Sequence, residues 1–351
     1  MAATIPIANL YYLLAYAWNH RLTEAELASV DADSCPDLNN FFARVLTTGT
    51  RSLLRRGLDR SYLAETEETP RIRGRIDFAT SEKTLSRTRG KLVCTYDELS
   101  PDVLHNRILK ATLRLLLGDA SLESELRPSL RQVLEPFGRV IDLRVSPRHF
   151  HRVQLHRNNR AYRFLLHLCE LVHRSHLPAR APDGRLRFRD FARDERIMAR
   201  VFEDFVRNFA GRHLTGARVS APKINWTADD FTGGAEHALP AMHTDVAIVW
   251  PHRKLILDCK YYREALTSRY DTLRHRSGNL YQLNAYLTNQ AHEPGWEQAE
   301  GMLLYPSNGY HLRHRFTLHR RHPVTIATID LAQPWPVIHS ELNDLLESRP
   351  P

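Results

Sequence analysis

Two short apolar segments joined by a tight turn constrain the fold of this chain more than any other feature. Residues 244–250 (TDVAIVW) and residues 254–262 (KLILDCKYY) flank the tripeptide PHR. Strands joined by so short a turn are antiparallel neighbours, so the start of the first lies beside the end of the second. Asp245 is therefore expected close to Asp258, and alternation along the second strand places Lys260 on the same face as Asp258.

The apolar patterns elsewhere in the chain predict an α/β fold with a mixed sheet flanked by helices. The polar, basic stretch at 147–160 lacks a pattern, so we expect a boundary near it, with a mixed α+β domain over 1–155 and a second domain over 156–351. The segments assigned from periodicity are helices at 5–18, 38–56, 103–117, 161–175, 191–214 and 278–290, and strands at 71–78, 91–96, 222–227, 301–305, 313–318 and 323–330.

Composition excludes several classes of protein. The 49 Lys and Arg residues exceed the 40 Asp and Glu residues by nine, which suits a nucleic-acid partner but is weak evidence for one. The sequence has no apolar run of about 18 residues, so we expect no membrane span. Its four cysteines are scattered without a CxxC pair, which argues against a zinc site and fits a reducing cytoplasm.

The grouping of two carboxylates with an ammonium group suits phosphodiester hydrolysis. Mg²⁺ takes hard oxygen ligands, and Asp245 and Asp258 supply them at adjacent strand ends. Lys260 can orient or deprotonate the attacking water, or neutralise charge in the transition state. A D-x-K sequence is also common by chance, and strand ends often carry polar residues. Three features favour the catalytic interpretation: the upstream Asp245, the apolar approach in LILDCK, and Glu203 on a preceding helix.

Two predicted helices offer further members of such a site. Glu203, in VFEDFVRNF, can contribute a third carboxylate to a metal, or it can lie on a solvated helix face. Gln282 and Tyr286 share a helix face at i, i+4 spacing and can contact a phosphate or a base. The alternative is a half-buried core tyrosine beside an exposed glutamine.

These residues together resemble a known pattern. Asp245, Asp258-Cys259-Lys260, a helical Glu203 and Gln282-x-x-x-Tyr286 resemble the PD-(D/E)xK nuclease superfamily, in the branch with a Q-x-x-x-Y helix. Further segments resemble the McrC family, the endonuclease subunits of McrBC modification-dependent restriction systems, in the same order from about residue 4 to residue 345. The segments are IPIANLYYLLAYAW, RIRGRIDF, YDELSPDVLHNRILKATL, LILDCKYY and NLYQLNAYL.

The resemblance implies a division of labour between two proteins. The C-terminal domain, 156–351, would be a PD-(D/E)xK core that cuts double-stranded DNA with modified cytosine. It would use Mg²⁺, or Mn²⁺ as a substitute, held by Asp245, Asp258 and Glu203, with Gln282 and Tyr286 on the substrate. The N-terminal domain, 1–155, would dock on an McrB-like AAA+ partner and stimulate its GTPase. The sequence has no G-x-x-x-x-G-K-[ST] motif, so GTP would act only through that partner.

Two departures from the pattern put little in doubt. Thr244 replaces the proline of the motif before Asp245, and Cys259 takes a position that is usually a small residue. We interpret Cys259 as a small apolar replacement, not as a nucleophile, because a reactive thiol needs exposure as well as a basic neighbour such as Lys260.

Several other motifs stay open or are set aside. The tripeptide beginning at His105 is not an HNH site, because it lies in a predicted helix without metal-ligand companions. The basic segment at 71–75 can face a partner, face DNA or form a solvated strand edge. The histidines of the C-terminal region are expected on a basic rim that is solvated or faces DNA, not as metal ligands; they are His311, His314, His319 and His322.

Two other functions compete with the nuclease subunit. One is a non-catalytic adaptor of the AAA+ GTPase, against which the intact Asp245, Asp258 and Lys260 speak. The other is a stand-alone, helicase-linked exonuclease, against which the lack of a cysteine cluster and the long N-terminal half speak.

Overall fold

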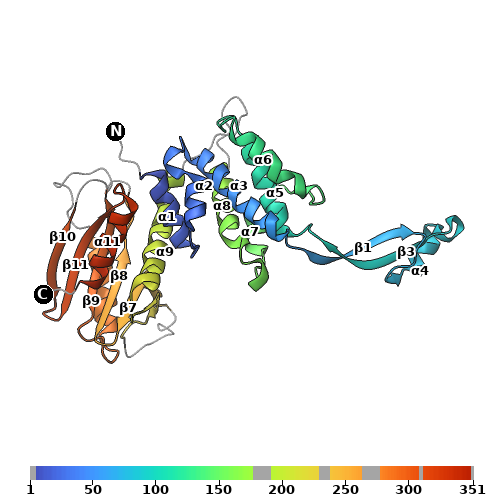
Figure 1. Ribbon diagram of the computed structural model, residues 1–351. Helices are drawn as coiled ribbons and strands as arrows, with labels where there is room; N and C mark the ends of the chain where they lie inside the picture. The colour runs from blue at the N-terminus through green and yellow to red at the C-terminus, as the bar shows by residue number, and fades with distance from the viewer. Residues whose placement is uncertain (1–4, 177–190, 229–237, 263–276, 308–310, 349–351) are drawn as a thin grey trace, which may run out of the picture. The chain divides into compact units, whose positions relative to one another are not determined.

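The computed structural model describes residues 5–176, 191–228, 238–262, 277–307 and 311–348. The chain forms two compact units (Figure 1): unit 1 combines Met1–Leu38 with Asp190–Pro351, and unit 2 is Asn39–Arg189. No helix in the described ranges is long and apolar enough to cross a membrane.

A six-stranded mixed sheet forms the centre of unit 1. Its strand order is β10-β11-β9-β8-β7-β4, with β8, β9 and β11 parallel and the other neighbours antiparallel. The strands are β4 (Arg218–Ser220), β7 (Val246–Trp250), β8 (Arg253–Cys259), β9 (Glu300–Ser307), β10 (Arg313–Leu318) and β11 (His322–Asp330). A two-stranded sheet joins β5 (Lys223–Ile224) to β6 (Met242–His243). The expected mixed sheet flanked by helices is confirmed, although the strand expected at 222–227 has only two residues.

Helices pack on this sheet because its strands are buried on both sides, as the buried neighbours Leu255, Ile256 and Leu257 show. Helix α9 (Glu195–His213) packs on β4, β7 and β8, and α11 (Trp335–Glu347) packs on β11. Helix α10 (Ser277–Gln290) packs through Leu283 and Leu287. A Cβ at Gly301 would lie 2.9 Å from Leu287 Cδ1, so any larger residue there would force the packed leucines of α10 to shift.

The first helix belongs to unit 1, which differs from the expected boundary near residue 155. Helix α1 (Ile7–Ala17) packs on α9, where Asn208 Nδ2 donates hydrogen bonds to the carbonyl oxygens of Tyr16 and Ala17 at 3.1 and 2.9 Å. Both carbonyls lie in the last turn of α1, which no further helical turn follows, and that of Tyr16 also accepts from the backbone N–H of Asn19. The short helix α2 (Glu24–Val30) follows, with Thr23 as its N-cap. A contact 190 residues away in sequence leaves no local signal, so the boundary could not be read from composition.

Unit 2 consists of helices and a long projecting hairpin. Residues 156–176 also belong to this unit, because α8 (Tyr162–His176) packs on α5 (Leu104–Leu117) and Thr112 Oγ1 lies 3.0 Å from His173 Nε2. The helices are α3 (Leu38–Arg56), α5 (Leu104–Leu117), α6 (Leu126–Leu134), α7 (Pro147–Arg152) and α8 (Tyr162–His176). Most of these match the sequence prediction because their apolar stripes are strong.

The hairpin, which we call the arm, comprises residues 61–100. Strand β1 (Ser61–Thr69) pairs antiparallel with β3 (Leu92–Ser100), and β2 (Arg75–Ile76) pairs with the other side of β3. Helix α4 (Phe78–Lys83) lies near its tip, and Figure 1 shows β1 and β3 projecting from the helices of unit 2. We did not expect β1 from the sequence, because nearly all of its residues are exposed and it lacks an apolar alternation.

Candidate active site

Asp245, Asp258 and Lys260 meet at the edge where β7 begins and β8 ends. The register pairs Val246 with Leu257, so the next pair outward is Asp245 with Asp258. Asp245 Oδ2 accepts a 2.7 Å hydrogen bond from the backbone N–H of Cys259, which fixes it against β8. Asp258 is fully buried, and Lys260 Nζ lies 3.0 Å from its Oδ1 and 2.8 Å from its Oδ2. The convergence predicted from the turn and the alternation is confirmed.

Helix α10 holds the lysine from the other side. Lys260 Nζ donates to Gln282 Oε1 at 2.9 Å, Gln282 Nε2 donates to the Tyr286 hydroxyl at 2.5 Å, and that hydroxyl donates to the carbonyl oxygen of His243 at 2.7 Å. Tyr286 is only 4% exposed. The i, i+4 pair thus shares one helix face, and in this structure it orients the lysine through a chain of hydrogen bonds.

Helix α9 brings Glu203 to the same region through Arg207. Arg207 Nη1 lies 3.4 Å from Glu203 Oε1 and 3.3 Å from the carbonyl oxygen of Asp245, and Arg207 also pairs with Asp204. Burial raises the pKa of Glu203, and the negative charges of Asp245 and Asp204 raise it further. The charge of Asp245 therefore acts on Glu203, although the side chain that pairs with Glu203 is Arg207.

The carboxylates lie in an environment that disfavours their charge. Burial raises the pKa of Asp258 to about 7; Lys260 opposes this rise and Asp245 adds to it. Burial likewise raises the pKa of Asp245, against the hydrogen bond from Cys259 N–H. Burial alone would lower the pKa of Lys260, but Asp258 and Asp245 outweigh it, so the pKa is raised and the ammonium form is favoured.

The donor set fits a hard divalent cation. Asp258 Oδ2 is buried and, among the described residues, receives no hydrogen bond; its neighbour is the Lys260 ammonium. Within those same ranges, no three histidine, cysteine or acidic side chains already form a metal-binding cluster. Mg²⁺ does not require one, because one or two carboxylates with water and a substrate phosphate complete its shell.

Two residues of this region were missed from the sequence. Arg207 bridges α9 to Asp245, and its position four residues after Glu203 could have indicated the pair. The carbonyl of His243 accepts from Tyr286, and a backbone acceptor leaves no mark in the sequence. Cys259 is buried, and burial raises its pKa well above the usual value, which supports its interpretation as a non-nucleophilic residue.

The other motifs also have defined places. His105 lies in α5, as expected, and its Nε2 is 2.9 Å from Asp59 Oδ2. His311, His314 and His319 are exposed, in keeping with a basic rim. The expectation for His322 was wrong: it is fully buried on β11, with Nδ1 2.8 Å from the carbonyl oxygen of Ala299. Its strand pairs with β9 in the interior of the sheet, which removes it from solvent.

Comparison with known proteins assigns the family. Residues 7–306 match the model of a family described as "McrBC 5-methylcytosine restriction system component". The chain belongs to this family. A relative from Escherichia coli (strain K12), named "Type IV methyl-directed restriction enzyme EcoKMcrBC", is 34% identical over 343 residues, which cover 98% of this chain and 97% of the relative. The chain is therefore a restriction-system subunit, as the resemblance predicted.

A solved structure shows that the likeness extends to the fold. It is a half-complex from the tetradecameric assembly of Thermococcus gammatolerans McrB AAA+ hexamers with bound McrC. The matched chain has a TM-score of 0.58 and 19% identity, with 97% of this chain and 76% of that chain covered. At 19% identity the match supports the mixed α/β architecture of this McrBC family member. It does not assign a role to any residue.

Proposed function

We propose that this chain is a Mg²⁺-dependent endodeoxyribonuclease whose catalytic residues are Asp245, Asp258 and Lys260, on a PD-(D/E)xK core. The observation that carries the proposal is the meeting of two buried carboxylates and one ammonium at a single sheet edge. Burying two carboxylates side by side is unfavourable unless a cation balances them. Family membership supports the same activity, since a relative is named a restriction enzyme.

In this proposal Asp245 and Asp258 would hold the metal directly. Glu203 would act as a third ligand, or through a bound water, after exchanging its contact with Arg207. When bound, Mg²⁺ lowers the pKa of a water molecule and polarises the phosphate. Asp258 must lose its proton for this role, and its raised pKa means that metal and proton compete for the same oxygens.

Lys260 would act on the reacting atoms from the opposite side of the carboxylates. Its ammonium is held between Asp258 and Gln282, so a water or phosphoryl oxygen placed beside the metal lies within its reach. The favoured charged form can orient the water and neutralise charge in the transition state. Gln282 would contact the substrate directly, and Tyr286 would support it through their hydrogen bond.

We further propose that an McrB-like AAA+ GTPase is the partner, and that the arm of unit 2 docks on it in the cytoplasm. The four cysteines all lie in the described part of the chain, where they are buried and form no disulfide, which fits a reducing compartment. The arm carries exposed apolar side chains at its tip, Ile72, Phe78 and Leu85, each between 63% and 67% exposed. Such side chains next to the arginines of 71–75 are typical of a protein interface. The solved relative is a complex of this kind.

The decisive test separates cutting from docking. We expect Asp258→Ala and Lys260→Ala to abolish cleavage of modified-cytosine DNA while the stimulation of the partner's GTPase persists. Retained cleavage in both variants would refute the site. A non-catalytic adaptor predicts no metal-dependent cleavage by the wild-type pair at all.

The docking proposal needs a different variant. Deleting 1–150 would remove α1 from unit 1, so a point change at the arm is sharper. We expect Phe78→Glu to abolish GTPase stimulation, whereas Val337→Glu, at an exposed apolar position of unit 1, should leave it unchanged. Full stimulation by Phe78→Glu would contradict docking through the arm.

A further inference from the structure

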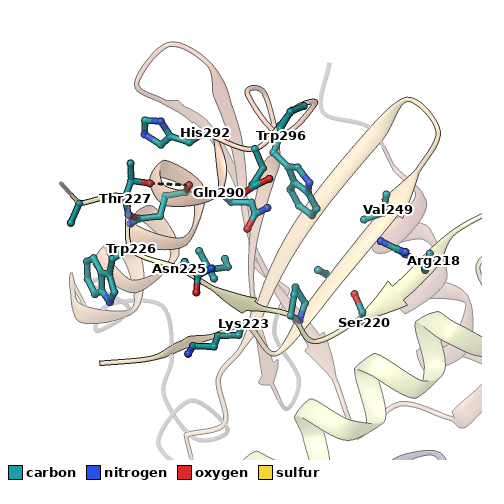
Figure 2. A pocket seen from close by; sticks show the side chains of 17 residues that line it. Arg218, Ser220, Lys223, Asn225, Trp226, Thr227, Val249, Gln290, His292 and Trp296 are labelled. Atoms are coloured by element: carbon teal, nitrogen blue, oxygen red, sulfur yellow. Dashed lines mark hydrogen bonds between the residues drawn. The ribbon is translucent and has the colours of Figure 1, made fainter. Parts of the chain in front are cut away.

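A polar hollow of about 600 Å³ lies in unit 1, beside the edge strand β4 (Figure 2). Its walls are the β4–β7 edge, residues 222–228, the end of α10 and the following loop. Its volume is in the range of pockets that hold one drug-sized ligand or nucleotide. The catalytic side chains are not part of its lining, so the hollow is a separate feature of the same unit.

The lining combines cations, an aromatic platform and amides. Arg218 and Lys223 are exposed, and neither forms an ion pair with another described residue. Trp226 is 39% exposed, with its indole N–H fixed to the carbonyl oxygen of Pro240 at 2.7 Å. Glu293 is the acidic member of the lining. Exposed cations together with an exposed indole are the groups that bind a nucleic-acid strand by phosphate contact and base stacking.

The segment that carries Trp226 is held in place. The backbone N–H of Thr227 donates to Asn289 Oδ1 at 2.7 Å, and Asn289 Nδ2 donates to the carbonyl oxygen of Ala285 at 2.8 Å. Figure 2 shows Asn225, Trp226 and Thr227 following one another along this wall. The indole therefore needs little further ordering to receive a base, which reduces the entropic cost of binding.

The hollow is aligned with the candidate active site. The register pairs Ser220 with Ala247 and Arg218 with Val249, so these four lining residues share one face of the sheet. Asp245 is two residues before Ala247 and four before Val249, so alternation along the strand places its side chain on the same face. At ~3.3 Å per residue, Val249 lies roughly 13 Å along β7 from Asp245.

We propose that this hollow binds an unpaired stretch of the DNA strand that is cut. Lys223 and Arg218 contact phosphates, and a base stacks on Trp226. A single strand is favoured over a duplex because paired bases do not expose their faces to an indole. The inference rests on the proposed nuclease function and adds to it a second contact with the substrate.

The test measures binding, not cleavage. A labelled octathymidylate is titrated into the full chain in EDTA, and its fluorescence anisotropy is followed. We expect Trp226→Ala to weaken binding about 5- to 150-fold, as the loss of one stacked base does, and Trp226→Phe to restore most of it. Lys223→Ala should reduce the salt dependence of log K by about 0.7, the value for one contact to a single strand. Arg315→Ala removes the same charge from β10, at the far edge of the sheet, and should change neither quantity.

Competition identifies the occupant. A duplex of the same length and free GMP should each compete at least ten times more weakly than the octathymidylate. Unchanged affinity in both Trp226→Ala and Lys223→Ala would overturn the proposal, and equal competition by duplex or by GMP would overturn the choice of an unpaired strand. Lys223 is exposed, so its replacement does not depend on the fold tolerating the loss of Trp226.

Failure of the nuclease assignment gives a different pattern. Asp258→Ala lies outside the hollow and should bind the octathymidylate with wild-type affinity while losing cleavage with the partner. Cleavage retained in Asp258→Ala refutes the nuclease site, whereas wild-type affinity in the hollow variants refutes only the present inference.

Discussion

Replacing Asp258 by asparagine should stabilise the metal-free protein at high pH. Asp258 is fully buried, and its pKa rises from 3.8 to about 7. Between these two pH values the folded protein binds more protons at Asp258 than the unfolded chain does. The contribution of Asp258 to the free energy of unfolding is therefore greatest below pH 3.8 and falls as the pH rises toward 7. At ~1.36 kcal/mol per unit, the ionised carboxylate destabilises the fold by about 4 kcal/mol at pH 8 as an upper limit.

Thermal unfolding in EDTA measures this effect. For a domain of about 200 residues, 1 kcal/mol shifts Tm by roughly 2–4 °C, so Asp258→Asn should raise Tm by about 10 °C at pH 8. At pH 5 only about 1.6 kcal/mol of this penalty has developed, so the gain in Tm should be less than half as large as at pH 8. The surface variant Asp344→Asn is the control and should show no such pH dependence.

Magnesium supplies the second half of the experiment. It should stabilise the wild-type protein more at pH 8 than at pH 6, because the metal must displace a proton. Asp258→Asn should lose most of this stabilisation. An unchanged Tm of the variant at pH 8, or an equal gain at pH 5 and pH 8, would refute the reasoning about the buried carboxylates.

Three further outcomes follow from the same contacts. Glu203→Gln should weaken Mg²⁺ binding about 10-fold in calorimetry, as loss of a supporting carboxylate does, and unchanged affinity would remove Glu203 from the metal site. Gln282→Leu removes the hydrogen bond that holds the Lys260 ammonium, so the single-turnover cleavage rate should fall at least about 10-fold while the Mg²⁺ affinity stays the same. A lower Mg²⁺ affinity would show that Gln282 supports the metal site and does not act through Lys260 alone. Tyr16→Phe removes the 2.8 Å hydrogen bond to His213 and should lower the free energy of unfolding by about 1 kcal/mol in urea, and no loss would argue that α1 contributes little through this contact.

Much of the candidate site could be predicted because its determinants are local. The two apolar segments and the short turn fix an antiparallel pair, and that pair alone brings Asp245 to Asp258. The spacing of Gln282 and Tyr286 places both on one helix face. The sequence does not show that Tyr286 is buried or that Gln282 turns toward Lys260, because both depend on how α10 lies over β9, which Gly301 permits.

The unit boundary and the arm were harder to predict for physical reasons. Helix α1 joins unit 1 through Asn208, a long-range contact that adds no local periodicity. Strand β1 is solvated on both faces, so its pairing with β3 depends on backbone hydrogen bonds and leaves no apolar alternation. His322 looks like one more member of a basic cluster, and only the sheet order shows that its strand is internal.

Cleavage by a lysine variant tests whether this sheet edge cuts DNA. The full chain, with its AAA+ partner, GTP and Mg²⁺, is assayed for cleavage of DNA containing modified cytosine, using Lys260→Ala and the matched variant Lys254→Ala from the same segment of chain. We predict no cleavage by Lys260→Ala and wild-type cleavage by Lys254→Ala, with the partner's GTPase stimulated equally by both. Cleavage by Lys260→Ala at the wild-type rate would contradict the assignment of this sheet edge as the site that cuts DNA.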